Sequence, residues 1–194
     1  MVVIPRKQRS KDKVIADRRN LASILTGLRA SGKTVVLTNG VFDLLHVGHT
    51  RSLEDARSRG DYLVVAVNSD KSAQALKGKG RPIQPATERM EVLAALSFVD
   101  YVTVFEDATA DGILEQFQPT LYAKGTDYTI KTLPERDTVK ALGIKAVFVG
   151  DKKGHSTAKL IQKIQKLPDG KDAAARPAAK KATKKAVKKP TGKG

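Results

Sequence analysis

The 194-residue sequence contains no cysteine and no tryptophan, and only 5% of its residues are aromatic. The absence of cysteine excludes disulfides and cysteine-based zinc sites, and it is typical of proteins in a reducing cytoplasm. No apolar run approaches the 18 residues that a membrane-spanning helix needs. Residues 1–7 lack the apolar stretch of a secretory signal. We therefore expect a cytoplasmic protein without a membrane partner.

Positive charge is abundant but unevenly distributed along the chain. The net charge is +16, of which residues 1–20 carry +5 and residues 168–194 carry +7. The distribution predicts three parts: a basic N-terminal extension (1–20), a folded domain (21–167) and a disordered Lys/Ala-rich tail (168–194). The tail repeats an A-x-K-K pattern. Such a tail is expected to bind polyanions weakly and in a salt-dependent manner, or to act only as a solvated, solubilising segment.

Apolar segments of two kinds alternate between these ends. Short runs rich in Val, Leu and Ala predict strands at 34–38, 62–67, 101–105, 121–123 and 145–149. Helical periodicity and helix-ending glycines predict helices at 21–28, 49–58, from 87 onward, and at 110–117, 135–142 and 157–166. The alternation indicates an α/β, Rossmann-like fold: a five-stranded, mainly parallel sheet with helices on both faces. Such sheets bind ligands beyond the carboxyl ends of their strands.

A distinctive segment, TNGVFDLLHVGH (38–49), follows the first predicted strand. Gly40 permits a tight turn, and Gly48 lets a ligand approach the backbone. The next helix presents free N–H groups that attract phosphate. His46 and His49 are three residues apart, so they share one face of the first helical turn. The segment therefore predicts a donor cluster for a polyphosphate.

Two other interpretations of these histidines are less favoured. A structural role is common for a single histidine, but two of the chain's three histidines flank a glycine at this turn. A zinc site is disfavoured because helical zinc ligands usually stand four residues apart and no cysteine is available to complete the set. We therefore predict no metal site built from protein side chains.

Polar residues also follow the other predicted strands. Asn68 and Asp70 come after the second strand, before the basic, Gly-rich segment that holds Lys77, Lys79 and Arg81. That segment either closes over phosphates or is a solvated loop. Arg89 lies early in the next helix, where it either reaches phosphate or pairs on the surface. Lys124, Gly125, Asp127 and Tyr128 follow the fourth strand, and Ser156 and Thr157 are positioned to cap the last helix.

Over residues 13–166 these segments together resemble the cytidylyltransferase-like nucleotidyltransferase superfamily. The H-x-G-H motif (46–49) and the Ser156-Thr157 signature carry the resemblance. The segments TNGVFD (38–43), AVNSD (66–70), LKG (76–78), RP (81–82), ERM (88–90) and KGTDY (124–128) make it closest to the bacterial D-glycero-β-D-manno-heptose 1-phosphate adenylyltransferases. Two positions depart from that pattern: Ala158 replaces the second threonine of S-T-T, and Thr126 stands in the K-G-G-D or K-G-A-D segment.

The resemblance implies roles for these residues. His46, His49, Lys77 and Arg89 are expected to contact the phosphates of ATP and the transition state. A second set is expected to bind the nucleotide: Thr38, Asn39, Gly40, Phe42, Asp43, Gly48, Lys124, Gly125, Ser156 and Thr157. A third set is expected to bind the sugar phosphate: Asn68, Asp70, Arg81, Asp127 and Tyr128.

The implied reaction transfers AMP from ATP to a sugar 1-phosphate and releases pyrophosphate. Mg²⁺ is expected to bridge the nucleotide phosphates with few protein ligands. Many relatives carry a sugar kinase domain on the same chain. The 194 residues leave no room for that domain, so a separate kinase is expected to make the substrate. A homodimer is expected by resemblance only.

Two alternatives stay open. The chain is either an adenylyltransferase or a cytidylyltransferase acting on glycerol 3-phosphate or another polyol or sugar phosphate, although Lys152 to His155 stand where the latter branch carries an arginine. An alternative of another class is a nucleic-acid-binding protein that acts through its Lys-rich tail, although no base-reading element is visible.

Overall fold

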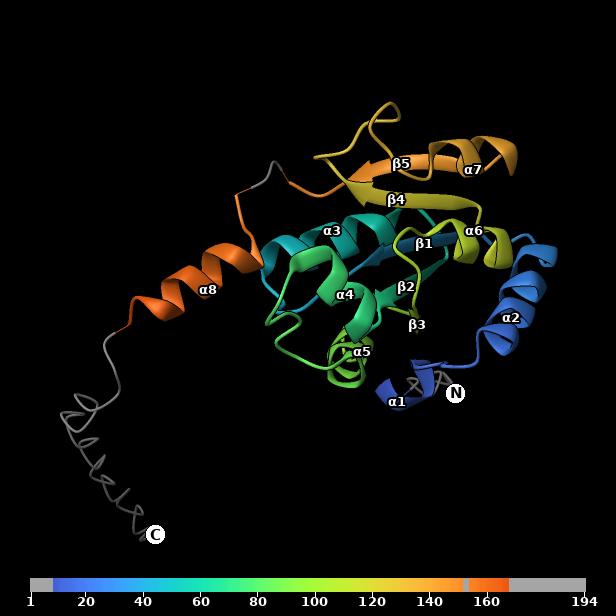
Figure 1. Cartoon of the computed structure of the whole chain (residues 1–194). Helices are drawn as coiled ribbons and strands as arrows, with labels where there is room; N and C mark the ends of the chain where they lie inside the picture. Colours follow the sequence, from blue (N-terminus) through green and yellow to red (C-terminus); the bar gives the residue numbers. More distant parts are fainter. Residues whose placement is uncertain (1–8, 152–153, 168–194) are drawn as a thin grey trace, which may run out of the picture.

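A computed structural model describes residues 9–151 and 154–167 (Figure 1). The predicted tail, residues 1–8 of the N-terminal extension, and Lys152 and Lys153 lie outside these described residues. Within them, five strands form one parallel sheet in the order β3-β2-β1-β4-β5. The strands are β1 (Val35–Gly40), β2 (Tyr62–Asn68), β3 (Tyr101–Phe105), β4 (Leu121–Gly125) and β5 (Lys145–Val149). The predicted fold class is confirmed, and all five strands lie where the sequence predicts them.

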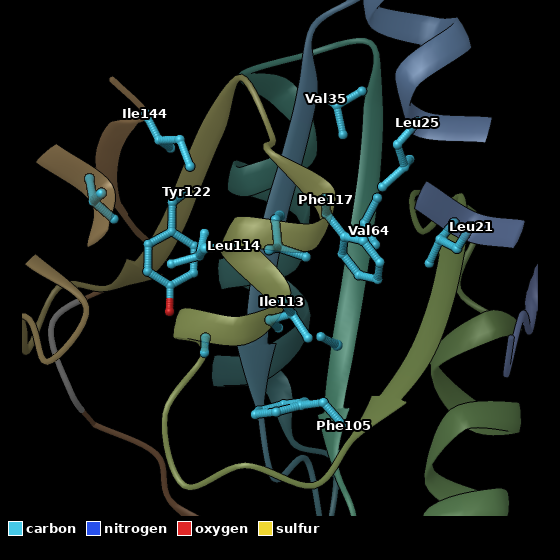
Figure 2. Packing of buried hydrophobic residues seen from close by; sticks show 14 of the residues in the cluster. Leu21, Leu25, Val35, Val64, Phe105, Ile113, Leu114, Phe117, Tyr122 and Ile144 are labelled. Atoms are coloured by element: carbon cyan, nitrogen blue, oxygen red, sulfur yellow. The ribbon is translucent and has the colours of Figure 1, made fainter. Parts of the chain in front are cut away.

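Helices cover both faces of the sheet, and each face has its own apolar core. On one face, the helices are α2 (Arg18–Ala30), α6 (Asp111–Phe117) and α7 (Arg136–Ala141). Their apolar side chains and those of the sheet form a core that includes Leu25, Phe117 and Tyr122 (Figure 2). On the other face, α3 (Val47–Ser58) and α5 (Ala86–Ala94) pack against the sheet, and this core includes Leu53 from α3 and Val65 from β2. A sheet buried on both faces explains why its strands read as continuous apolar runs.

Two short helices were not expected from the sequence. Helix α1 (Ser10–Lys13) lies in the predicted N-terminal extension, where Lys13 is buried and Val14 pairs with Val102. Helix α4 (Asp70–Lys77) occupies a segment interpreted as a polar strand end. Ser69 caps α4 by accepting a hydrogen bond from the Ser72 amide, 3.2 Å away. Only Ser72 and Ala73 of this helix are buried, so it has no apolar stripe for periodicity to reveal.

The last helix, α8 (Thr157–Gln165), stands away from the rest of the domain and buries none of its residues (Figure 1). Ser156 caps it, as predicted, by accepting a hydrogen bond from the Lys159 amide at 3.2 Å. The Thr157 hydroxyl donates to the Leu44 carbonyl oxygen, 3.2 Å away, which connects α8 to the loop before α3. No helix in the described ranges has the length and apolar character needed to cross a membrane.

The order of the strands determines where a ligand can enter. The chain winds outward from β1 to β3 on one side and returns to β4 and β5 on the other. The loops after β1 and β4 therefore leave the sheet in different directions and create a crevice between them. The first turn of α3 and the segment that leads into α8 lie at this same end.

Candidate active site

A cavity of about 400 Å³ lies at the carboxyl ends of β1 and β4. Its walls bring together segments from four separate parts of the chain. The predicted site residues that line it are Thr38, Asn39, Gly40, Phe42, Asp43, His46, Gly48, His49, Lys77, Arg81, Gly125, Asp127, Ser156 and Thr157. Among the lining residues that the sequence interpretation did not assign are Ser52, Asp151 and His155.

The turn after β1 brings aromatic rings together at the cavity wall. Phe42 adopts a left-handed backbone conformation (φ 47°), which is uncommon for a residue other than glycine. Its ring meets the edge of the His49 ring with 5.4 Å between centroids. A Cβ atom at Gly40 would lie 3.0 Å from the Phe42 ring, so a larger residue here would require the ring to shift. The TNGVFD segment is thus shaped to place Phe42 against His49.

His46 and His49 stack on the first turn of α3, with 3.8 Å between ring centroids and 15° between ring planes. His46 is the N-cap, and its Nδ1 accepts a hydrogen bond from the His49 amide at 3.4 Å. Since Nδ1 accepts, neutral His46 carries its proton on Nε2 and can donate it to a ligand. A Cβ atom at Gly48 would lie 3.1 Å from the His46 ring, so glycine also allows this stacking.

Both imidazoles favour the neutral form in the ligand-free protein. Burial lowers the pKa of His49 to about 4, and repulsion from His46 when that ring is protonated is the second cause. Burial, followed by His155, also lowers the pKa of His46. Nδ1 of His49 is buried and has no hydrogen-bond partner within the described part of the chain. A polyphosphate entering the cavity would favour the protonated rings, so the site is expected to gain positive charge when an anion binds.

The lowered pKa of His49 predicts a pH-dependent stability. Unfolded histidine has a pKa of 6.5, so below this pH the unfolded chain binds a proton that folded His49 accepts only near pH 4. This part of the stability is complete above pH 6.5 and is lost as the pH falls toward 4. Between pH 7.5 and pH 5, wild type should lose about 2 kcal/mol more free energy of unfolding than His49→Gln. Urea unfolding at both pH values measures this, and equal losses in the two proteins would contradict it.

Asp43 anchors the basic segment that contributes Arg81 to the lining of the cavity. Its carboxylate is 2% exposed and accepts hydrogen bonds from the backbone N–H groups of Ile83 (2.8 Å) and Gln84 (3.0 Å) and from Nε of Arg81 (2.6 Å). Burial raises the pKa of Asp43, but the two amides and the Arg81 charge outweigh burial and lower the pKa overall. Residues 81–84 are therefore anchored beside the cavity, and Arg81 lines it.

Arg89 is placed differently from what the sequence suggested. It is 1% exposed, and its guanidinium donates to the carbonyl oxygens of Val41 (2.5 Å) and Gln84 (2.9 Å) and to Asp70 Oδ1 (2.7 Å). All three partners are protein groups, and Arg89 does not line the cavity. The surface pair expected from the sequence is therefore wrong, and Arg89 lies outside the lining of the cavity where its phosphate contact was expected. Arg89 instead ties the Val41 turn to the segment that Asp43 anchors.

Three of the predicted sugar-binding residues, and Lys124, also lie outside the cavity lining. Asn68 is buried and donates to the Ser72 hydroxyl at 2.8 Å. Asp70 binds Arg89 and accepts from the Ala86 amide. The ring of Tyr128 lies 5.0 Å from Nζ of Lys124. The sequence predicted that these residues follow strands, but a strand-end position gives no information on the direction of a side chain.

These features form a site at the end of a parallel sheet, lined by the N-terminus of a helix and by basic side chains. A family model described as cytidylyltransferase-like matches residues 37–175. The chain belongs to the cytidylyltransferase-like family. The match includes both the H-x-G-H turn and the Ser156-Thr157 segment, and it identifies the chain as a nucleotidyltransferase.

Curated proteins similar to this cytidylyltransferase-like chain include two called Bifunctional protein HldE. The protein from Geobacter sulfurreducens is 45% identical over 146 residues, which cover 75% of this chain and 30% of the relative. The protein from Syntrophotalea carbinolica is 43% identical over 153 residues, covering 79% and 31%. The chain therefore spans about a third of the length of these relatives.

A solved structure has the same fold. The lipopolysaccharide core biosynthesis protein from Thermoplasma volcanium superposes with a TM-score of 0.54 at 24% identity, covering 63% of this chain and all of that one. At this identity the likeness establishes the fold alone.

Proposed function

We propose that this nucleotidyltransferase transfers AMP from ATP to D-glycero-β-D-manno-heptose 1-phosphate, giving ADP-heptose and pyrophosphate. The observation that carries the proposal is the cavity itself. It is lined by the stacked pair His46 and His49 at the start of α3 and by the basic side chains of Lys77 and Arg81. The resemblance of segments 38–43, 66–70 and 124–128 to heptose 1-phosphate adenylyltransferases supports the choice of acceptor. The chain is also 45% identical over 146 residues to a protein called Bifunctional protein HldE.

The reaction requires positioning more than proton transfer. An oxygen of the sugar phosphate attacks the α-phosphorus of ATP, a P–O bond forms there, and the bond to the β-phosphate breaks to release pyrophosphate. The second pKa of a phosphate monoester is about 6, so the attacking oxygen is already ionised near neutral pH. No general base is needed, and the protein contributes donors for the charge that develops on the α-phosphate and on the leaving group.

Each donor group has a place in this scheme. Nε2 of His46, the His49 ring and the α3 amides would bind phosphate oxygens on one wall. Lys77 and Arg81 would bind them on the other, and Ser156 and Thr157 would present the start of α8. Arg89 would act indirectly by holding the Val41 turn.

Mg²⁺ fits this site as an ion that arrives with the nucleotide. Within the described ranges, no group of three or more His, Asp or Glu residues is placed to hold a metal. Asp43 and Asp151, both in the cavity wall, are already paired with Arg81 and Arg51 at 2.6 Å. Phosphate oxygens and water would therefore supply most of the ligands. When bound, the ion neutralises charge on the triphosphate.

The proposal is tested by measuring pyrophosphate release with ATP and with CTP, each against heptose 1-phosphate, other sugar 1-phosphates and glycerol 3-phosphate. We expect kcat/KM to be highest for ATP with the heptose phosphate, by about tenfold or more over each alternative pair. A preference for CTP and glycerol 3-phosphate would instead establish the cytidylyltransferase. The proposal also requires a kinase activity that phosphorylates the sugar at C1, and assembly as a homodimer stays a prediction.

A further inference from the structure

A group of four polar side chains connects β1 and β4, the two strands whose carboxyl ends border the cavity, with the start of α7. Asn39 is the next-to-last residue of β1, Tyr122 and Lys124 belong to β4, and Glu135 immediately precedes α7. Oδ1 of Asn39 accepts two hydrogen bonds, from the Tyr122 hydroxyl at 2.7 Å and from Nζ of Lys124 at 3.1 Å. Nζ of Lys124 lies 3.8 Å from Oε1 of Glu135. Of the four residues, only Asn39 lines the cavity.

These contacts determine which way the Asn39 amide faces. A lysine ammonium can only donate hydrogen bonds, so the Asn39 atom beside it must be the oxygen. The nitrogen, Nδ2, is therefore turned away from Tyr122 and Lys124. Nδ2 makes no hydrogen bond with any described residue, and it is not among the described atoms that are both buried and unpartnered. An amide that lines the cavity in this way offers two N–H donors to a ligand.

Glu135 keeps the lysine in its place. It is 2% exposed, and its Oε1 also accepts a hydrogen bond from the Ala110 amide at 3.1 Å. Burial lowers the pKa of Lys124, and the Glu135 carboxylate is the main influence that raises it. Tyr122 is fully buried, and burial raises its pKa, so its hydroxyl stays a donor. Figure 2 shows the Tyr122 ring packed in the core with its hydroxyl at the edge of the cluster.

We propose that Tyr122, Lys124 and Glu135 are positioning residues that hold Asn39 as a fixed hydrogen-bond donor to an uncharged oxygen of the substrate, a hydroxyl or a carbonyl. The Lys124 charge is matched by Glu135, so this wall presents a neutral amide, whereas the cationic donors for phosphate lie around His46 and Lys77. Lys124 thus acts on Asn39, whereas the resemblance implied a direct contact with the nucleotide. The inference rests on the proposed function for the identity of the substrate only.

The held amide is tested without any substrate. The side-chain NH₂ signals of Asn39 in a ¹⁵N-labelled sample are assigned by their loss in Asn39→Asp. We expect Tyr122→Phe and Glu135→Gln, both close in shape to the residues they replace, to shift or broaden these signals. Tyr62→Phe is the matched control, because Tyr62 lies at the start of β2 and stacks on Tyr101, outside the cavity lining. Signals unchanged in both variants would overturn the held amide, even if the enzyme assay failed.

A double-mutant cycle then tests whether the network acts through Asn39. Asn39→Ala should lower kcat/KM by about tenfold, which corresponds to one lost hydrogen bond. Tyr122→Phe should lower it by a similar factor, and the double variant should be no worse than Asn39→Ala alone. If the kcat/KM losses of the two single variants multiplied in the double variant, Tyr122 would not act through Asn39, and the proposal would be wrong.

The chemical class of the contacted oxygen has its own measurement. Pyrophosphate is a product that offers only phosphate oxygens. We expect its inhibition constant to change less than twofold in Asn39→Ala while kcat/KM falls. A tenfold weaker inhibition would show that Asn39 binds phosphate and would overturn the uncharged-oxygen assignment. Failure of wild type to release pyrophosphate from any substrate pair would contradict the proposed function and leave the NMR test of the amide intact.

Discussion

Replacing His49 with alanine is expected to lower kcat for pyrophosphate release by about 10²-fold, the scale of losing one preorganised donor to a developing charge. The expected loss is large because several features of the fold converge on this ring. It stacks on His46 at 3.8 Å, packs against the Phe42 ring in a T-shaped arrangement and stands on the first turn of α3. It is also neutral before the nucleotide binds, so its greatest donor strength develops only when negative charge enters the cavity.

The measurement is the steady-state rate with saturating ATP and sugar phosphate, so that kcat is separated from KM. Thermal unfolding of the variant controls for the fold, since alanine removes a ring that packs against His46. His49→Asn serves as the matched variant, because its amide retains a donor of shorter reach. Activity of His49→Ala within a few-fold of wild type would remove His49 from the transition state.

The outline of this site was predictable because it follows from the backbone. Apolar runs fixed the strands, and the position of Gly40 and Gly48 between β1 and α3 indicated a turn that a ligand could approach. In a parallel sheet the carboxyl ends of all strands meet at one edge. Residues far apart in sequence, such as Lys77 and Ser156, were therefore expected at one cavity, and the structure places both in its wall.

The direction of side chains was not predictable in the same way. Arg89 was interpreted as a phosphate ligand or a surface residue, yet it lies on the same buried face of α5 as Met90 and Leu93. That spacing was a usable signal, because it places an arginine where the helix faces the core. Glu135 gave no such signal, since a glutamate before a polar helix resembles any exposed residue. Its burial depends on Lys124, eleven residues earlier, and only the folded chain shows that pairing.

The second large effect is expected for Asp43→Ala. Asp43 is the sole carboxylate that the described residues place within hydrogen-bond reach of Arg81, and it also accepts from the Ile83 and Gln84 amides. Its removal leaves a cation and two backbone donors without their acceptor, which costs about 3 kcal/mol of unfolding free energy. Residues 81–84 then lose their anchor, and Arg81 loses its fixed place in the cavity wall.

Activity should therefore fall together with stability, and more steeply than stability alone explains. We expect kcat/KM to drop by about 10²-fold at a temperature where the variant is still folded. Asp43→Asn separates the two roles of the carboxylate. Its remaining oxygen can still accept from the backbone amides, so stability should recover in part. Its NH₂ group would face Nε–H of Arg81, and two donors cannot form a hydrogen bond with each other. The kcat/KM value should therefore stay low.

Asp61→Asn is the matched control for both measurements. Asp61 also accepts a hydrogen bond from a backbone amide, that of Thr34 at 2.8 Å, and also pairs with a basic residue, Lys33. It precedes β2 at the amino-terminal end of the strands, away from the cavity, and its side chain is 45% exposed. Its replacement should therefore cost less than about 1 kcal/mol and leave kcat/KM unchanged. If Asp43→Ala behaved like this control, the carboxylate would not be the anchor of the basic wall. A loss of activity specific to Asp43 would instead show that the phosphate site depends on a residue whose oxygens are all directed toward the protein.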